Sequence, residues 1–302
     1  ILLRIPDELS RFCKVASHDD ILDLLETTDR SYIAVKASRK GCLNSALFCE
    51  QLLEWLEQQY PNRLRVFEQT PVSLVDLRVT HALSKTEQGN IISDYVVLCT
   101  NGFENIELKN EIGVDINGRF HEKLEGTIGY MTAYVSEENQ PPTAISYFEP
   151  KHSSRLDPYV YITRRPREEI QNSTKTTAHN LICIGGPEIT LEDKSIYDRH
   201  HHEYPQEAIE KTTAFIQKTF SAEQQTGTFD FTWHGLMGYT TNGVRLIGFE
   251  PCNNHLLYNL GCNGVGILPS IFGGLRISRL ISGELLPPSM FDVNDQRCML
   301  PE

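Results

Sequence analysis

The chain has 302 residues, of which 40% are hydrophobic and 23% are charged, with a formal net charge of -12 at pH 7. This composition is typical of a globular protein with one large or two moderate domains. The acidic balance argues against nucleic-acid binding, because it repels phosphates. No apolar run reaches the roughly 18 residues that a membrane span needs, and no signal peptide is evident.

Helix and strand patterns alternate in the first third of the chain. Leu and Ile at helical spacing predict one or two short helices within residues 1–30. An apolar stripe against glutamates predicts a helix over residues 44–60. Strands are predicted over residues 31–37, 64–68, 71–77 and 92–100, and the last has a continuous apolar core suited to burial on both faces.

Runs of β-branched and aromatic residues dominate the middle of the chain. They predict strands over residues 126–135, 143–148, 159–163 and 181–185, followed by a helix over residues 204–220. A helix is also predicted from the glycine turn near residue 266 to about Gly283. The last 18 residues, from Leu285, are rich in Pro, Asp and Asn and are typical of a tail or a partner-binding arm.

The eight cysteines include no Cys-x-x-Cys pair, which argues against a zinc ribbon or a thioredoxin-like motif. Cys99 and Cys183 lie in apolar runs, so we expect buried, reduced cysteines and a cytoplasmic location. The glycosylation pattern at Asn172 is then without consequence. Three adjacent histidines, residues 200–202, point in different directions on any regular element, so we interpret them as a polar loop and predict no metal site.

Three glycines, Gly261, Gly264 and Gly266, separate an apolar strand from the last predicted helix. They allow a sharp turn and leave no side chain in the way of a ligand. The first helix amides are unpaired and lie at the positive end of the helix dipole. A planar, electron-accepting ring could lie there and have its negative charge stabilised. Such turns are common, so the residues upstream decide the interpretation.

Residues 233–248 precede this turn, separated from the apolar strand by a polar hairpin at residues 250–255. The order is an aromatic strand, a Thr-x-Asn-Gly turn, a Leu-Ile-Gly strand, an apolar strand and Gly-x-x-Gly-x-Gly opening a long helix. It resembles the C-terminal signature of the FAD-dependent amine and amino-acid oxidoreductases, the D-amino-acid oxidase superfamily. The Thr-Arg-Arg-Pro and Ile-Gly-Gly-Pro-Glu elements resemble gamma-glutamyl-polyamine oxidases more than the D-amino-acid oxidases themselves.

The resemblance implies a mixed α/β fold with FAD as cofactor. An FAD/NAD(P)-binding-type domain is then built from discontinuous segments, with a mainly antiparallel β substrate domain between them. The expected boundaries are residues 1–105 for the first FAD-binding part, 106–233 for the substrate domain, 234–284 for the return to the FAD-binding domain, and 285–302 for a C-terminal tail.

The resemblance also implies which residues bind the cofactor. Val72, in a Thr-Pro-Val element, would meet the adenine, although a plain core valine is the alternative reading. The end of the buried strand and the glycine turn would bind the rest through Thr100, Asn101, Gly102, Gly261, Asn263, Gly264, Val265, Gly266 and Ile267.

The residues expected to bind the substrate differ from those of the family. The resemblance implies that the family's carboxylate-binding arginine corresponds to Met237 or Gly238 here, and that a second cationic position falls near Leu268; neither place holds a cation that could pair with a carboxylate. We therefore take Tyr161, Tyr239 and Arg164 as candidates for the catalytic site. For Arg164 and Arg165, the alternative is two solvated arginines on an exposed edge strand.

The function implied is oxidation of the C–N bond of an amine or an N-substituted amino acid by hydride transfer to flavin, with a small molecule as partner. The family's opening Gly-x-Gly-x-x-Gly turn and ribose-binding glutamate are absent. We therefore expect that a natural N-terminal segment is missing and that this chain binds FAD poorly. The alternative is a non-catalytic, flavoprotein-like scaffold or a truncated binding module. The sequence assigns no oligomeric state.

Overall fold

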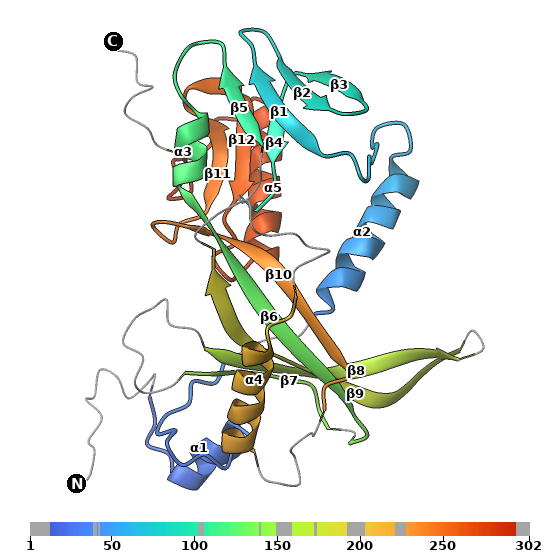
Figure 1. The fold of residues 1–302 in the computed structure, drawn as a ribbon, viewed down its shortest axis with the longest axis vertical. Helices are drawn as coiled ribbons and strands as arrows, with labels where there is room; N and C mark the ends of the chain where they lie inside the picture. The colour runs from blue at the N-terminus through green and yellow to red at the C-terminus, as the bar shows by residue number, and fades with distance from the viewer. Residues whose placement is uncertain are drawn as a thin grey trace. The chain divides into compact units, whose positions relative to one another are not determined.

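The computed structural model describes residues 13–38, 41, 43–101, 106–138, 140–148, 159–171, 174–191, 203–220 and 228–293. The helices in these ranges are α1 (His18–Leu24), α2 (Ser45–Gln59), α3 (Asn117–Glu122), α4 (Gln206–Thr219) and α5 (Ile267–Ile281) (Figure 1). None of them is long and apolar enough to span a membrane. The strands are β1 (Val72–Leu77), β2 (Ala82–Thr86), β3 (Gly89–Ser93), β4 (Val96–Leu98), β5 (Glu107–Asn110), β6 (Leu124–Ser136), β7 (Thr143–Tyr147), β8 (Val160–Gln171), β9 (Thr174–Thr190), β10 (Phe231–Thr240), β11 (Leu246–Glu250) and β12 (Asn253–Leu260).

The described residues form both helices and strands, which confirms a mixed α/β fold. The chain divides into two compact units. Unit 1 comprises Ile1–Leu43, Gly129–Glu188 and Glu203–His234. Unit 2 comprises Asn44–Ile128, Ile189–His202 and Gly235–Glu302.

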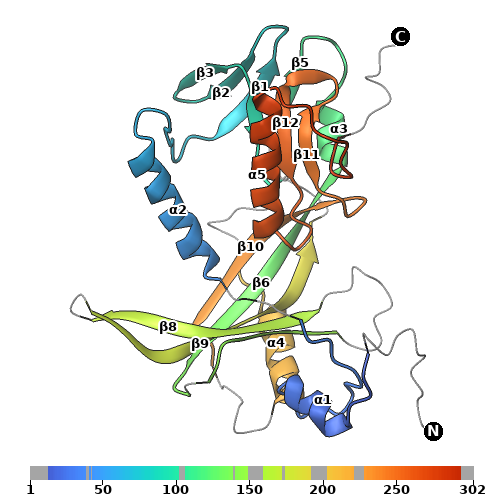
Figure 2. The same ribbon diagram turned by 180° about the vertical axis from the view of Figure 1, so that it is seen from behind.

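Unit 1 is organised by a five-stranded sheet with the order β10-β6-β9-β8-β7. Helices α1 and α4 lie on one side of β7, β8 and β9 (Figures 1 and 2). Leu22 of α1 and Ile216 of α4 pack there against Ile162 and Ile184 of the sheet and against Tyr147. Because side chains alternate along a strand, Ile162 and Ile184 lie on the face of the sheet that the two helices cover.

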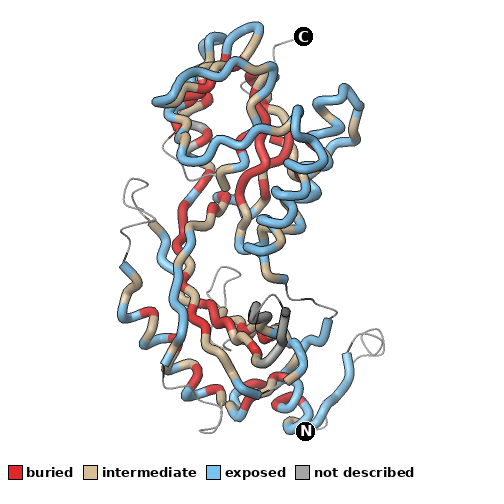
Figure 3. Tube along the Cα trace, turned by 90° about the vertical axis from the view of Figure 1, so that its right-hand side faces the viewer, coloured by how far each residue is buried: buried red, intermediate tan, exposed pale blue. Residues whose placement is uncertain are grey.

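Unit 2 contains two smaller sheets, with the orders β3-β2-β1-β5 and β11-β12-β4. Helix α5 packs on the second sheet, where Ile277 is buried with Ile247 and Leu257. Helix α2 buries none of its residues and is exposed along its length in Figure 3. On α5, the exposed side includes Leu268, Ile271 and Leu275.

Two predicted strands, residues 31–37 and 64–68, are wrong, because both segments have irregular backbone. In the first, Tyr32 is buried while Ile33 is 79% exposed, so one side chain anchors the segment without a sheet partner. The strand predicted over residues 92–100 is divided between β3 and β4, which belong to different sheets. Burial on both of its faces is also wrong, since Ile92 is 69% exposed and Leu98 is buried.

The domain boundaries differ from those expected, because the segment up to Leu43 belongs to unit 1 and residues 44–128 to unit 2. Long-range hydrogen bonds explain the first assignment. The Tyr147 hydroxyl donates to the Leu25 carbonyl at 2.7 Å, and the Thr27 hydroxyl donates to the Thr219 carbonyl at 2.7 Å. These bonds and the burial of α1 residues against the sheet attach the segment to unit 1, although it precedes α2 in the sequence.

The expected tail does not begin as a loose arm. Arg276 of α5 pairs with Asp292 at 2.7 Å, and the Ile247 amide donates to the Phe291 carbonyl at 2.9 Å. Val293 is buried in the core of unit 2. Residues 287–293 thus dock on the unit that contains α5, and the remaining residues of the tail lie outside the described ranges.

Two expectations about the cysteines are wrong. Cys252 is disulfide-bonded, and Cys99 is exposed, whereas Cys183 is free and buried as expected. Because stable disulfides are rare in the cytosol, the disulfide removes the cysteine argument for a cytoplasmic location. Asn172 and the histidines at residues 200–202 lie outside the described residues.

Candidate functional site

The C-terminal ends of β4 and β12 lie side by side in unit 2. The two strands run parallel, with Leu98 opposite Tyr258. Two bonds join the residues that follow them: the Gly261 amide donates to the Asn101 carbonyl at 3.3 Å, and the Cys262 amide donates to the Asn101 side-chain oxygen at 2.9 Å. The ends of two parallel strands are thereby locked together just before α5 begins.

Asn263 joins the same turn to the end of β10. Its side-chain oxygen accepts from the Thr240 amide at 2.8 Å and from the Thr240 hydroxyl at 3.2 Å. Its own amide donates to the Gly238 carbonyl at 3.1 Å. Asn101 and Asn263 both have a positive φ, 63° and 47°, which asparagine tolerates better than most residues. Both predicted cofactor residues thus use their side chains to shape the turn.

Glycine is needed where these strands approach each other. A Cβ on Gly238 would lie 1.7 Å from the Asn101 carbonyl oxygen, so any other residue would displace the backbone. Gly264 has a φ of 79°, and a Cβ there would lie 3.0 Å from the Tyr239 hydroxyl oxygen. Tyr239 therefore stands directly beside the turn, as the sequence predicts.

Helix α5 begins at Ile267, and its N-cap residue Gly266 makes no side-chain cap. The first amides of the helix have no intrahelical acceptor and lie at the positive end of the dipole. Val265 is 61% exposed beside them. This amino end can accept an anionic or electron-rich group from solvent.

The Thr100 hydroxyl, one residue before Asn101, is buried and has no hydrogen-bond partner among the described residues. Leaving such a group unsatisfied costs about 1–3 kcal/mol, so an orphaned hydroxyl here indicates a missing acceptor or donor. Val72 is half-buried and packs against the core of unit 2, where β1 shifts its register against β2. Gly102 lies outside the described residues.

Arg245 is a residue of this site that the sequence analysis missed. It is buried, and its guanidinium donates to the Asn259 side-chain oxygen at 3.1 Å, the Gly261 carbonyl at 3.3 Å and the Ser270 hydroxyl at 2.7 Å. Burial lowers the pKa of Arg245, and the nearby Cys262 and Cys99 oppose that shift. A cation with neutral acceptors thus lies behind the turn. An arginine between Val244 and Leu246 was the available sequence signal.

Tyr161 and Arg164 belong to unit 1, and the structure does not bring them together. The Tyr161 hydroxyl donates to the Met131 sulfur at 3.0 Å, and burial raises the Tyr161 pKa to about 12. Arg164 lies three positions further along β8, within a stretch of regular pairing, so it lies on the opposite face. Arg165, in contrast, shares the face of Tyr161.

Arg164 forms a bidentate ion pair with Glu26, at 2.7 and 3.0 Å, and donates to the Pro141 carbonyl at 2.8 Å. Strand β8 has β7 on one side and β9 on the other. The alternative of a solvated arginine on an edge strand is therefore wrong for Arg164. Its guanidinium already has a carboxylate, which leaves it poorly placed to bind another anion.

Comparison with known families finds a match over residues 13–280 to the family model described as FAD dependent oxidoreductase. A search of curated proteins found no match.

Several solved structures resemble the chain. Glycine oxidase from Geobacillus kaustophilus has 14% identity, covers 76% of this chain and 53% of its own, and gives a TM-score of 0.52. Glycine oxidase from Bacillus cereus ATCC 14579 has 16% identity, with 76% and 54% covered and a TM-score of 0.52. NikD, described as an unusual amino acid oxidase essential for nikkomycin biosynthesis, has 11% identity, with 77% and 54% covered and a TM-score of 0.51. The chain spans about half the length of these structures, and the likeness shows a shared fold.

Proposed function

Because the chain belongs to the FAD dependent oxidoreductase family, we propose that the whole protein binds FAD and oxidises the C–N bond of an amine or an N-substituted amino acid. The observation that supports this most is the meeting of the ends of β4, β10 and β12 at the amino end of α5. The similar glycine oxidases and NikD, an amino acid oxidase, support the substrate class.

The residues present fit the flavin end of FAD. The buried Thr100 hydroxyl needs a partner, and a flavin ring carries both donors and acceptors at its edge. Gly264 and Gly266 present no side chain in front of α5, so a ring can approach the backbone closely. We assign the flavin to this turn and the adenine to Val72.

When bound, FAD supplies the hydride acceptor for the carbon next to the substrate nitrogen. The amino end of α5, which begins at Ile267 after Gly266, would stabilise negative charge at the ring edge through the first helix amides, which lack an intrahelical acceptor, and through the helix dipole. Arg245 adds a fixed positive charge behind the same turn. Asn101 and Asn263 keep the turn in shape, so that these groups need no rearrangement during the reaction.

For the substrate, Tyr239 lies beside Gly264 and is a candidate for contact with the bound molecule. Tyr161 stays a neutral phenol at pH 7, because burial raises its pKa to about 12. Its one O–H donates to the Met131 sulfur, a weak acceptor, and could donate to the substrate instead without adding negative charge. Arg165 replaces Arg164 as the candidate for binding an anion, because it shares the face of Tyr161.

A non-catalytic scaffold is the second candidate. Two points favour it: the positions at which the resemblance implies a cationic residue, Met237 or Gly238 and one near Leu268, hold none, and Arg164 is committed to Glu26. A scaffold of this kind would keep the fold and the turn without substrate oxidation.

The absorption spectrum of the protein expressed from its full natural coding sequence tests the proposal. We expect the two visible bands of oxidised flavin, and their anaerobic bleaching by at least one member of a series containing glycine, sarcosine, benzylamine and putrescine. A protein that stays colourless after FAD is added contradicts the cofactor assignment. A yellow protein that no amine bleaches favours the scaffold.

A further inference from the structure

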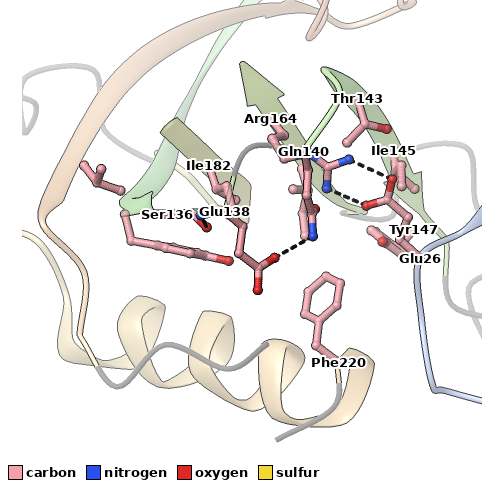
Figure 4. A pocket seen from close by; sticks show the side chains of 13 residues that line it. Glu26, Ser136, Glu138, Gln140, Thr143, Ile145, Tyr147, Arg164, Ile182 and Phe220 are labelled. Atoms are coloured by element: carbon pink, nitrogen blue, oxygen red, sulfur yellow. Dashed lines mark hydrogen bonds and ion pairs between the residues drawn. The ribbon is translucent and has the colours of Figure 1, made fainter. Parts of the chain in front are cut away.

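Unit 1 contains a pocket of about 270 Å³ on the face of the sheet that carries Arg164 (Figure 4). Phe220, which caps α4, and Glu26, which follows α1, contribute to its lining. We propose that this pocket binds a small organic cation, an ammonium group carried on an apolar carbon body. The inference is independent of the proposed flavin site, since none of the residues assigned to FAD line this pocket.

The charges around the pocket leave it negative. Glu26 and Arg164 neutralise each other through their bidentate pair. Glu138 remains as a second carboxylate, and one of its oxygens accepts from the Gln140 side-chain amide at 2.6 Å. In Figure 4 the side chains of Glu138, Gln140 and Glu26 all line the same hollow. An entering anion would be repelled, whereas an ammonium group would find carboxylate oxygens with remaining lone pairs.

The walls suit the rest of such a ligand. Tyr134, Tyr147 and Phe220 contribute aromatic rings, and Ile145 and Ile182 contribute apolar surface. Aromatic faces attract cations, and apolar surface stabilises a carbon body through burial. Burial also raises the pKa of both Tyr134 and Tyr147. Both tyrosines therefore stay neutral at pH 7 and add no charge to the pocket.

Glu26 is held in an uncommon backbone conformation, with a φ of 49° directly after the C-cap of α1. Glycine is the usual residue at this position, because other side chains are strained there. The pair with Arg164 fixes the side chain of Glu26, yet that side chain remains 37% exposed. Its carboxylate is thus positioned and still reachable by a ligand.

Three probes of similar shape and different charge test the proposal: benzylammonium, benzyl alcohol and benzoate. Isothermal titration calorimetry on the chain without added FAD, at pH 7 and low salt, should show binding of benzylammonium. Benzyl alcohol should bind about tenfold more weakly, because it lacks the charge-assisted hydrogen bond, and benzoate should not bind.

Glu138→Gln should weaken benzylammonium binding about five- to tenfold. The matched control is Glu137→Gln, since Glu137 is the exposed neighbour that does not line the pocket, and it should leave the affinity unchanged. Raising the salt from about 0.02 M to about 0.5 M should weaken binding of the same probe to the unmodified chain. This salt series tests the charge without any substitution.

Benzoate binding as tightly as benzylammonium would overturn the proposal, as would equal affinities for the unmodified chain and Glu138→Gln. A titration with about 10 mM benzylammonium detects binding even when the Kd is above about 1 mM. Absence of binding in that titration would overturn the proposal as well.

Discussion

Tyr161 and Arg164 stand three positions apart on β8 and serve opposite faces of one sheet. The Tyr161 hydroxyl donates to Met131 at 3.0 Å, whereas Arg164 pairs with Glu26 on the face that α1 and α4 cover. Tyr161 is thus a candidate for contact with the substrate. Arg164 instead stabilises unit 1 through its ion pair with Glu26 and lines a separate pocket. Substitutions at the two positions should therefore differ in kind.

Arg164→Met should lower the free energy of unfolding by roughly 2–4 kcal/mol, because it removes one partner of a largely buried ion pair and leaves Glu26 uncompensated. Urea denaturation measures this loss. Arg165→Met is the control: Arg165 is half-buried and forms no ion pair with another described residue, so the change should stay within about 1 kcal/mol. Equal losses for the two variants would contradict the assignment of Arg164 to the ion pair.

Gly238→Ala should destabilise unit 2 severely or displace the turn, because the new Cβ would lie 1.7 Å from the Asn101 carbonyl oxygen. We expect a loss of at least about 3 kcal/mol, in the range of strained or overpacked positions. Gly235→Ala, three residues earlier on the same strand, has no atom within 4 Å of the added Cβ and should be tolerated. Thermal unfolding of the two variants makes the comparison; similar melting temperatures would rule out the close contact.

Asn263→Ala and Asn263→Gly separate two roles of one residue. Both remove the acceptor for the Thr240 amide and hydroxyl, at a cost of about 1 kcal/mol for each hydrogen bond. Alanine must in addition adopt the positive φ of 47°, which costs about 1 kcal/mol more than it costs glycine. Chemical denaturation should therefore rank the unmodified chain above Asn263→Gly, and Asn263→Gly above Asn263→Ala. The opposite order for the two variants would show that backbone strain is unimportant here.

Stability should fall in alkali between about pH 10 and 12. Burial raises the pKa of Tyr161 and of Tyr204 to about 12 in the folded chain, from the ordinary tyrosine value of 10.0. In that window the unfolded chain has lost these protons while the folded chain keeps them, so unfolding becomes more favourable as pH rises. Denaturation at several pH values measures the slope, and Tyr161→Phe should reduce it. An unchanged slope in this variant would mean that Tyr161 titrates normally in the folded chain.

Local pattern was sufficient for the described helices except α3, which was not predicted, and for the glycine turn. The apolar stripe predicted a helix over residues 44–60, and the structure confirms it as α2. The glycine turn and α5 also lie where the sequence places them. The prediction failed at residues 31–37 and 92–100, where burial is set by distant segments. Arg245 escaped notice because its hydrogen-bond partners, Asn259 and Ser270, are 14 and 25 positions away.

The sequence by itself determined the family, most of the helices and the turn at Gly261–Ile267, because these depend on residue types at fixed local spacing. Only the tertiary structure decided what each polar side chain does. The Asn101 side chain meets Cys262 across 161 positions, and Arg164 meets Glu26 across 138. Such pairings depend on strand register and on which face a helix covers, and a shift of one residue would reverse every side chain of a strand.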